Sequence, residues 1–564
     1  MKRREFIKKM SVLSAAPFML NGIPFRLLAG NNELKRMAAS CPNDRVLIIL
    51  QLHGGNDGLN TLIPISDYNT YYNVRPNIAI SDRGPRKFIR LDSTLPDNAQ
   101  VGLHPDMIGI KSLYDEGKVA ILQGVSYENH NQSHFRGRDI MFMGGGANDY
   151  INSGWIGRAL KDKYLPLIYP DDFPNNDMRD PLALEFGNEV SLVFHQGDNI
   201  STSISINDPI SFFNLVDNLE GFDDVEGIDP RGVPPAALQN SPYGKELNWI
   251  LNLEQKTDEY DDRLKEVYNI GKANAPGITY PSTYPFNAPS RFLKNTLSAQ
   301  LQIIANLIHG GCQTKVYLVR VGGFDTHAQQ VESYDASMGV HAALLYHVSA
   351  AMKAFQQDLA ARGIDHRVLT VTTSEFGRRI RSNGSFGSDH GIGAPTFLFG
   401  KGVIPGVLGV NPDLTQENVS MQYDYRQVYA TIMKEWMCAD PLLVDNLSGI
   451  FYGDYPGRGI SLPIVNSNLN SINDFVYKRF RLNNCYPNPA SHFTTFSFYI
   501  NAETLVELKL LNSEGKEIKT ILNDWKGMGE HSITVDLSDL KPGIYLYQIK
   551  AGILKDTKQL SVIK

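Results

Sequence analysis

Cysteine is scarce in this chain, with four residues among 564. Cys41, Cys312, Cys438 and Cys485 lie far apart, in neither a metal-binding spacing nor a disulfide framework. The chain could form one disulfide after export, but the sequence does not show which two cysteines would pair.

An excess of positive charge is also missing. The formal net charge is −6, and without residues 1–30 the chain holds 48 basic and 59 acidic residues, a balance of −11. A protein this acidic is a poor partner for nucleic acid or anionic membranes. Beyond the first thirty residues no apolar run is long enough to cross a bilayer, so we expect no stable membrane span. The length and a hydrophobic content of 42% predict a soluble protein of two or three domains.

The N-terminus combines paired arginines with a short apolar stretch. Arg3 and Arg4 precede the run EFIK, which resembles the twin-arginine export signal. The apolar stretch over 10–23 is too short for an anchor and is interrupted by Pro17. We therefore predict that 1–30 is a targeting segment read by the twin-arginine machinery, the alternative being a basic amphipathic N-terminus of a cytosolic protein. That route exports folded proteins, so a metal could be inserted before export.

Four apolar runs, each followed at once by a polar turn, predict buried strands of a parallel sheet. They are Arg45–Leu52, Val119–Gly124, Lys315–Val321 and Arg367–Thr373. Between them, Ser290–Ile308 and Gly339–Arg362 repeat apolar residues every three or four positions, as amphipathic helices do. Residues 40–454 are thus predicted to form an α/β domain, a mainly parallel sheet sandwiched by helices.

Two regions differ from this pattern. Residues 150–290 have few strand signals and one polar helix candidate, Pro242–Asn269, so we interpret them as an insertion or cap. Residues 455–482 are rich in Pro, Asn and Ser and are predicted to be a linker.

The tail, 483–564, alternates short apolar and polar positions. Thr504–Leu511 and Gly543–Ile549 are two of its predicted strands, and the whole favours a small antiparallel β-sandwich. Its ordered motifs are Tyr486-Pro-Asn-Pro489, Gly515-Lys516, Gly529, Asp536-Leu-Ser538, Pro542-Gly-Ile-Tyr545 and a final lysine. They resemble the type-A sorting domain of the type IX secretion system of Bacteroidetes. The resemblance implies secretion or attachment at the cell surface through that machinery; the alternative is a carbohydrate-binding or adhesion sandwich.

Candidate ligands collect in the turns after the four predicted strands, where α/β sheets bind ligands. The turns are His53-Gly-Gly-Asn-Asp57-Gly, Asn129-His130-Asn-Gln-Ser133-His134-Phe135-Arg136, Gly322-Gly-Phe-Asp325-Thr-His327, and Ser374-Glu375-Phe376-Gly377-Arg378 with Ser388-Asp389-His390-Gly391. Carboxylates and imidazoles at one sheet edge suit a divalent cation. A single Asp or His in a polar turn is more often a cap or a solvated residue, so the prediction depends on the four turns meeting.

Three further residues have candidate catalytic roles. Ser133, directly before a helical stretch, is the nucleophile candidate, since a helix N-terminus and a metal both favour its alkoxide; the alternative is simple N-capping. Arg136 and Arg378 are candidates for holding an anionic substrate, with salt bridges as the alternative.

The same motifs resemble a known family. The run LHGGNDGLN, the Ser-His-Phe turn, GGFDTH, SEFGR followed by Asp-His-Gly, and Asp424-Tyr-Arg426-Gln-Val-Tyr429 are similar to the family catalogued as domain of unknown function 1501, over about 40–450. That family is similar to the alkaline phosphatase, sulfatase and phosphoglycerate mutase superfamily. The resemblance implies an alkaline-phosphatase-like fold with one or two metal ions.

Residue by residue, the resemblance implies a first-strand ligand at Asp57 and a nucleophile at Ser133. It implies one ion at Asp325, His327 and His390, and a second near Glu375. The chain departs from the superfamily pattern in two ways: Phe376 stands where a ligand histidine is usual, and Asp325 and His327 are unusually close in sequence. Asp389 could restore a missing ligand. Because no Cys-x-Pro-x-Arg motif is present, a formylglycine sulfatase is not expected.

These features predict a secreted, metal-dependent hydrolase of phosphate or sulfate esters, with a small-molecule or polysaccharide ester as substrate. Imidazole ligands favour zinc or manganese, while an all-oxygen second site would favour calcium or magnesium. The alternative is a surface-displayed, non-catalytic binding or assembly protein on the same fold.

Overall fold

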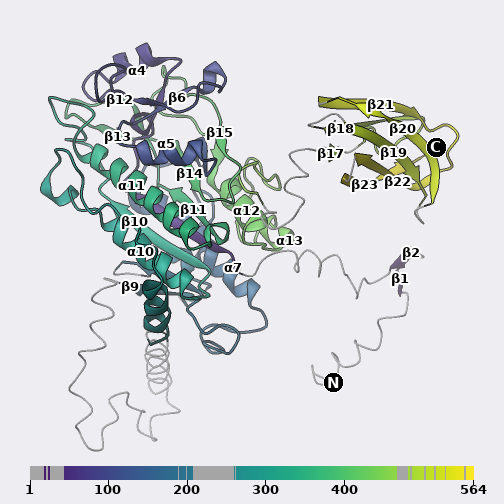
Figure 1. Ribbon diagram of the computed structural model, residues 1–564, viewed down its shortest axis with the longest axis horizontal. Helices are drawn as coiled ribbons and strands as arrows, with labels where there is room; N and C mark the ends of the chain where they lie inside the picture. Colours follow the sequence, from purple (N-terminus) through teal and green to yellow (C-terminus); the bar gives the residue numbers. More distant parts are fainter. Residues whose placement is uncertain are drawn as a thin grey trace, which may run out of the picture. The chain divides into compact units, whose positions relative to one another are not determined.

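The computed structural model describes residues 18–20, 23–25, 44–187, 190–197, 200–206, 260, 262–466, 480–482, 485–500, 504–512, 516–527, 529–551 and 554–563. The chain divides into two compact units, Met1–Val465 and Asn466–Lys564 (Figure 1). In the predicted targeting segment two short strands, β1 (Phe18–Leu20) and β2 (Ile23–Phe25), pair antiparallel; the paired arginines lie outside the described residues. None of the helices described combines the length and the apolar character that crossing a bilayer requires.

A nine-stranded sheet forms the centre of the first unit within the described residues. Its spatial order is β15 (Gly406–Leu408), β7 (Val119–Ser126), β14 (Ala394–Phe399), β11 (Val368–Thr373), β3 (Val46–His53), β10 (Val316–Gly322), β8 (Ala183–Phe186) and β9 (Ser203–Ile206), and β16 (Tyr423–Asp424) pairs with β7. Only β14 runs against the others. The sheet is therefore mainly parallel, as predicted, and all four predicted strands are present.

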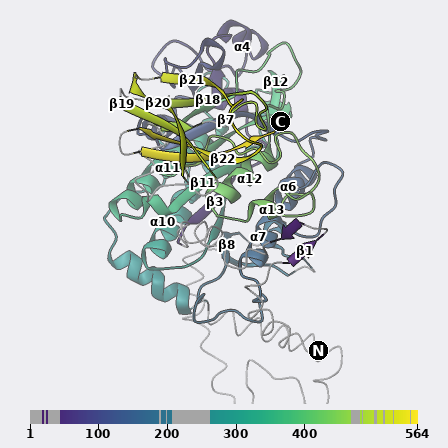
Figure 2. The same ribbon diagram turned by 90° about the vertical axis from the view of Figure 1, so that its right-hand side faces the viewer.

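Helices cover both faces of this sheet, as the view along its layers shows (Figure 2). One layer contains α5 (Ile108–Asp115), α10 (Thr296–His309) and α11 (Val340–Ala361); the other contains α6 (His134–Met143), α7 (Trp155–Lys163), α12 (Tyr425–Glu435) and α13 (Pro441–Val444). Short 3-10 turns occur at η1 (Asp97–Ala99), η2 (Leu192–Phe194), η3 (Ser290–Phe292) and η4 (Asp365–Arg367). Both predicted helices are present, but α10 begins at Thr296 and not at Ser290, because residues 290–292 form the 3-10 turn η3 and Asn295 caps the backbone N–H of Ser298.

The sandwich explains the continuous apolar run of β3. Val46, Ile48 and Leu50 join the core cluster that includes residues of α10 and α11. The intervening Leu47 and Ile49 point to the opposite face, because side chains alternate along a strand, and they are equally buried. A strand buried on both faces has no position for a polar residue until it reaches its end.

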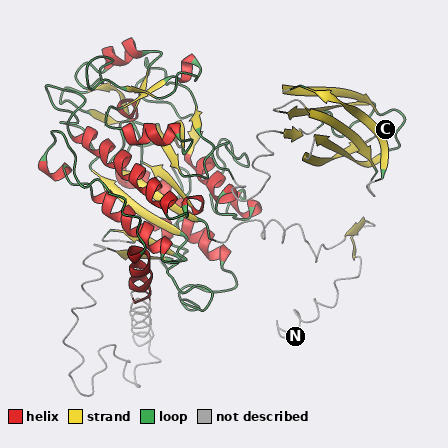
Figure 3. Ribbon diagram, viewed as in Figure 1, coloured by secondary structure: helices red, strands yellow, loops and turns green. Residues whose placement is uncertain are grey.

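Smaller elements lie near the carboxyl ends of the strands (Figure 3). They are α3 (Gly58–Thr61), α4 (Tyr68–Val74), the sheet of β4 (Leu62–Pro64), β6 (Val101–Leu103) and β5 (Ile89–Arg90), and the pair of β12 (Arg378–Ser382) and β13 (Ser388–His390). The β12–β13 pair carries two of the sequence-predicted site residues at its ends, Arg378 and His390, which are directly paired.

The region 150–290, interpreted as an insertion, contributes two strands to the central sheet. β8 pairs in parallel with β10, and β9 pairs in parallel with β8. These strands are only four residues long and carry Glu185, Ser203 and Ser205, so they lack the apolar run that marks the other strands. Of the helix expected over Pro242–Asn269, residues 262–269 are helical and 242–259 lie outside the described residues.

The second unit is a small antiparallel sandwich, as predicted. One sheet contains β17 (Phe480–Leu482), β18 (Phe493–Ile500) and β21 (Gly529–Asp536); the other contains β20 (Glu517–Lys526), β19 (Thr504–Leu511), β22 (Gly543–Ala551) and β23 (Leu554–Val562). Val506, Leu508 and Leu510 are completely buried in its core, on the predicted side of β19.

The segment expected to be a linker begins on the first unit. Leu462 and Ile464 are buried there, and Ile464 accepts a backbone hydrogen bond from Ile404. The start of the predicted linker is therefore packed on the first unit, because Leu462 and Ile464 bury their apolar side chains there.

Two of the four cysteines, Cys312 and Cys485, are free and buried. Cys438 is disulfide-bonded. A stable disulfide is typical of proteins outside the cytosol.

Candidate metal centre

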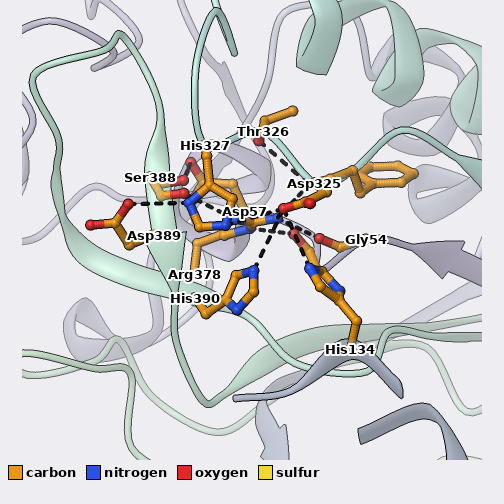
Figure 4. Close-up of polar contacts among 12 residues, drawn as sticks. Gly54, Asp57, His134, Asp325, Thr326, His327, Arg378, Ser388, Asp389 and His390 are labelled. Carbon is orange, nitrogen blue, oxygen red and sulfur yellow. Dashed lines mark hydrogen bonds and ion pairs between the residues drawn. The ribbon is translucent and has the colours of Figure 1, made fainter. Parts of the chain in front are cut away.

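The four predicted turns meet at one edge of the sheet. β3, β10 and β11 are neighbours in parallel register, with Gly322 opposite His53 and Thr373 opposite Gln51. Their carboxyl ends are therefore level, and β7, two places further along, points the same way. The turns after these strands bring together the side chains of Asp325, His134, His327 and His390 (Figure 4). Glu375 lies next to His134.

Three imidazoles surround one carboxylate oxygen. The distances from Asp325 Oδ1 to the Nε2 atoms are 3.3 Å for His327, 3.4 Å for His134 and 3.6 Å for His390. The ligand atoms of His134, Asp325 and His390 all lie within 4.8 Å of one another. Figure 4 shows the three rings pointing at Asp325 from different segments of the chain.

Each imidazole is oriented by an acceptor at its other nitrogen. His134 Nδ1 lies 3.0 Å from Glu375 Oε1, His327 Nδ1 lies 3.2 Å from Asp389 Oδ1, and His390 Nδ1 lies 2.8 Å from the carbonyl oxygen of Gln132. Carboxylate and carbonyl oxygens only accept hydrogen bonds, so each Nδ1 carries the proton. In the neutral ring the lone pair is then on Nε2, the atom that faces Asp325.

This arrangement leaves polar atoms unsatisfied. His134 Nε2 and His390 Nε2 are buried and have no hydrogen-bond partner in the described residues. Lone pairs that face a carboxylate oxygen at 3.4 and 3.6 Å repel it, unless a cation lies between them or the rings are protonated. Burial lowers the pKa of His390, which favours its neutral form. The residues present therefore fit a divalent metal ion.

Glu375 is buried beneath the imidazoles. Its Oε1 accepts the backbone N–H of Gly54 at 2.8 Å as well as the proton of His134. Burial raises the pKa of this carboxyl, but these hydrogen bonds outweigh it and the pKa lies below its ordinary value. Its Oε2 is buried with no hydrogen-bond partner among the described residues. Glu375 thus orients His134 and brings a buried negative charge to the site.

Donors around the site hold its carboxylates in their charged form. Burial raises the pKa of Asp325, but the hydrogen bond and the charge of Arg378 outweigh burial, and the pKa lies below its usual value. The pKa of Asp389 is also lowered, chiefly by its hydrogen bond from Asn383. Charged carboxylates beside imidazoles are the donors that a divalent cation prefers.

Asp57, predicted as a metal ligand, does not face this cluster. It is completely buried and forms an ion pair with Arg75 at 2.8 Å. Its oxygens also accept hydrogen bonds from Gln330 Nε2 and from the backbone N–H groups of Leu59 and Asn60, in the first turn of α3. Burial raises the pKa of Asp57, but the charge of Arg75 outweighs it, and the pKa falls to about 2. The sequence could not indicate this partner, because Arg75 stands in an unremarkable helix end.

The two arginines expected to hold substrate have other partners. Arg378 is completely buried; it donates to Asp325 at 2.7 Å and to the backbone carbonyls of Gly54, Gly55, Phe324 and Ser388. It therefore fixes the turns of the site in place.

Arg136, in the first turn of α6, binds backbone carbonyl groups of the segment after this helix. Its guanidinium donates to the carbonyl oxygens of Ala147 and Asp149 and stacks on Tyr150, 4.1 Å from the ring centroid. Neither arginine has the free fork that binding an anion requires.

Ser133 begins α6, immediately before the ligand candidate His134. Its Oγ accepts the backbone N–H of Arg136 at 3.4 Å, a long N-cap hydrogen bond. Gly137, one turn on, packs against Glu375: a Cβ there would lie 3.0 Å from the Glu375 carbonyl oxygen. The close packing holds the N-terminus of α6 beside the metal candidates.

His134 is the residue that sequence reasoning missed as a ligand. Its ring lies against Phe376, with centroids 4.6 Å apart, and Phe376 also contacts His390 at 4.5 Å. Phe376 stands where the superfamily pattern has a histidine, and His134 brings an imidazole to its side from a different strand end. The sequence signal that could have identified His134 as a ligand is its position directly after the predicted N-cap residue Ser133.

The geometry defines an α/β domain with an Asp/His cluster at the carboxyl edge of a mainly parallel sheet. Residues 294–449 match a family described as a protein of unknown function (DUF1501). Residues 484–564 match the secretion system C-terminal sorting domain. The chain is therefore directed by type IX secretion to the cell surface or outside. No curated protein matches it.

Several solved structures are similar at low identity. The PsFucS1 sulfatase from Pseudoalteromonas sp. is 11% identical over 89% of this chain and 86% of its own, with a TM-score of 0.30. The phosphonate monoester hydrolase SpPMH from Silicibacter pomeroyi is 11% identical over 92% and 88%, with a TM-score of 0.27. An FMN-binding beta-glucuronidase from Facaelibacterium prausnitzii L2-6 is 14% identical over 25% and 22%, with a TM-score of 0.12.

Proposed function

We propose that this protein is an exported, metal-dependent hydrolase of phosphate or sulfate esters. The observation that carries the proposal is the set of three Nε2 atoms around Asp325 Oδ1, next to a serine at a helix N-terminus. A divalent ion bound there would polarise an ester oxygen and stabilise the charge of an attacking or leaving oxygen.

Ser133 is the proposed nucleophile. Its hydroxyl accepts a single long hydrogen bond, from Arg136 N, and keeps its own proton available for transfer. The positive end of the α6 dipole favours the alkoxide that attack on an ester requires. Its place in the chain directly before the proposed ligand His134 supports a nucleophile close to the ion.

The free backbone N–H groups in the first turn of α6 are the proposed contact for the anionic part of the substrate. Helix N-termini bind phosphate and sulfate through such groups. In this proposal they take the role that sequence reasoning gave to Arg136 and Arg378, whose guanidinium groups donate to the protein's own carbonyl groups and to Asp325.

The test combines metal analysis of the purified full chain with turnover of aryl phosphate and aryl sulfate esters. The variant Ser133→Asn keeps a good N-cap but has no hydroxyl, and His390→Ala removes one imidazole. We expect bound metal and turnover in the wild type, metal without turnover in Ser133→Asn, and neither in His390→Ala. Turnover that survives in Ser133→Asn would remove the serine mechanism, and a metal-free wild type would remove the proposal.

One observation favours a second candidate function, a surface-displayed binding or assembly protein. Arg136, Arg378 and Asp57 are all engaged by partners within the protein, so fewer charged groups are available to chemistry than the sequence indicated. A wild type that binds metal and turns over neither ester class would favour this function.

A further inference from the structure

The three imidazoles of the site are oriented by acceptors from three separate segments. Glu375 follows β11, Asp389 lies in β13, and Gln132 precedes α6. A chance cluster of histidines around a carboxylate would not have every ring held in the same tautomer. Groups that hold the far nitrogen of a metal-binding imidazole fix its orientation and raise its basicity.

From this geometry we infer that the site is built for one cation of the zinc class, bound through three Nε2 atoms and Asp325, with Asp389 and Glu375 as positioning residues. The inference deepens the proposed function and rests on it in one respect, that the cluster holds a divalent cation. It adds the class of cation, the number of ions and the residues that set affinity.

The class of cation follows from the donor atoms. Three neutral nitrogens and one carboxylate oxygen form a set typical of zinc and similar borderline metals. Calcium requires six to eight oxygens and magnesium an octahedron of oxygens, mostly water and carboxylate. Asp325 is the one carboxylate that the three Nε2 atoms face.

The number of ions follows from the arrangement of the ligand atoms. Among the described residues, one group of histidine and carboxylate atoms lies close enough to share an ion, and it contains His134, Asp325 and His390. Asp57 does not add a second site, because Arg75, Gln330 and the first turn of α3 engage both of its oxygens.

Asp389 offers the cleaner test of positioning, because its side chain is 48% exposed and its replacement does not open the core. Its Oδ1 accepts a hydrogen bond from Asn383 Nδ2 at 2.9 Å as well as the proton of His327. Asn383 Nδ2 also donates to the His327 carbonyl oxygen at 2.8 Å. Asp389 is thus fixed independently of any ion.

The experiment measures zinc, calcium and magnesium binding to the chelator-treated full chain by calorimetry, with cobalt absorption as a report on ligand geometry. We expect one zinc per chain and no saturable calcium or magnesium site. Asp389→Ala should weaken zinc binding about 10–100-fold and alter the cobalt spectrum. Asp389→Asn should restore most of the affinity, since its amide oxygen still accepts from His327.

Two further comparisons complete the design. Glu375→Ala should weaken zinc binding and Glu375→Gln should restore most of it, because Glu375 orients His134 as Asp389 orients His327. Glu417→Gln is the matched control: this exposed carboxylate pairs with Arg379 at 2.7 Å and orients no imidazole, so zinc binding should not change.

The outcomes separate this inference from the proposed function. Zinc affinity unchanged in Asp389→Ala and Glu375→Ala would overturn the positioning roles, and two ions per chain or preferred calcium binding would overturn the cation class and number. In each case a metal-dependent hydrolase would still stand. If zinc binds as inferred but neither ester is turned over, the proposed function fails and the inference holds.

Discussion

Two carboxylates at the same edge of the sheet have opposite surroundings. Asp57 is completely buried, with an arginine at 2.8 Å and backbone N–H groups saturating its oxygens. Asp325 is half exposed and, apart from Arg378, faces imidazole nitrogens without hydrogen bonds. The first is a completed structural ion pair, and the second is surrounded by groups that could hold a metal ion. The partners, not the residue type, decide whether a carboxylate supports the fold or binds a ligand.

The largest effect should come from breaking the buried pair. Arg75→Met leaves Asp57 charged and unpaired in the interior, which costs roughly 3–5 kcal/mol of unfolding free energy. Urea unfolding followed by circular dichroism measures it. A loss below about 1 kcal/mol would mean that the Asp57 carboxylate finds water or another donor.

Zinc should stabilise the protein through the other cluster. At free zinc 100 times the dissociation constant, binding to the folded state alone adds about 2.7 kcal/mol. His390→Ala should lose this increment, whereas Asp57→Asn should keep it, because His390 belongs to the proposed ligand set and Asp57 does not. Equal zinc stabilisation in both variants would contradict the division between the two clusters.

Acid should weaken the Asp57 cluster over a defined range. The folded pKa of about 2 lies below the ordinary value of 3.8, so the folded state binds this proton less readily than the unfolded one. The resulting stability, about 2 kcal/mol, is fully present above roughly pH 4–5 and is lost as pH falls toward 2. The difference in unfolding free energy between wild type and Asp57→Asn should therefore shrink on acidification. A pH-independent difference would show that Asp57 contributes by hydrogen bonding alone.

The smallest expected change in unfolding free energy distinguishes the role of Ser133 as the N-cap of α6 from its proposed role as a nucleophile. Ser133→Ala removes the N-cap of α6 and should cost about 1 kcal/mol, while Ser133→Asn should cost almost nothing. Thermal unfolding of the two variants beside the wild type gives the comparison. If both are equally destabilised, the serine contributes more than a cap to the fold.

The sequence predicted the scaffold well for a simple reason. Strands such as Val46–His53 and Val368–Thr373 are buried on both faces, so their composition alone identifies them. β8 and β9 were missed because they are short and carry Glu185 and Ser203. The sandwich was predictable because its alternating strands have one buried face.

The candidate site was predictable only in part. Asp325, His327 and His390 do lie together, and Glu375 and Asp389 lie around them as supports for imidazoles. Neither the Arg75 partner of Asp57 nor the backbone carbonyls around Arg378 leave a mark in the sequence, because both contacts join distant segments.

The amino-acid sequence by itself determined the parallel sheet, the C-terminal sandwich and the strand ends at which polar side chains gather, because hydrophobic periodicity and turn chemistry are local. Only the tertiary structure decided which carboxylate pairs with an arginine, which nitrogen of each imidazole carries the proton, and that His134 joins the cluster. Those outcomes depend on distances and hydrogen-bond directions between segments hundreds of residues apart, which no local pattern encodes.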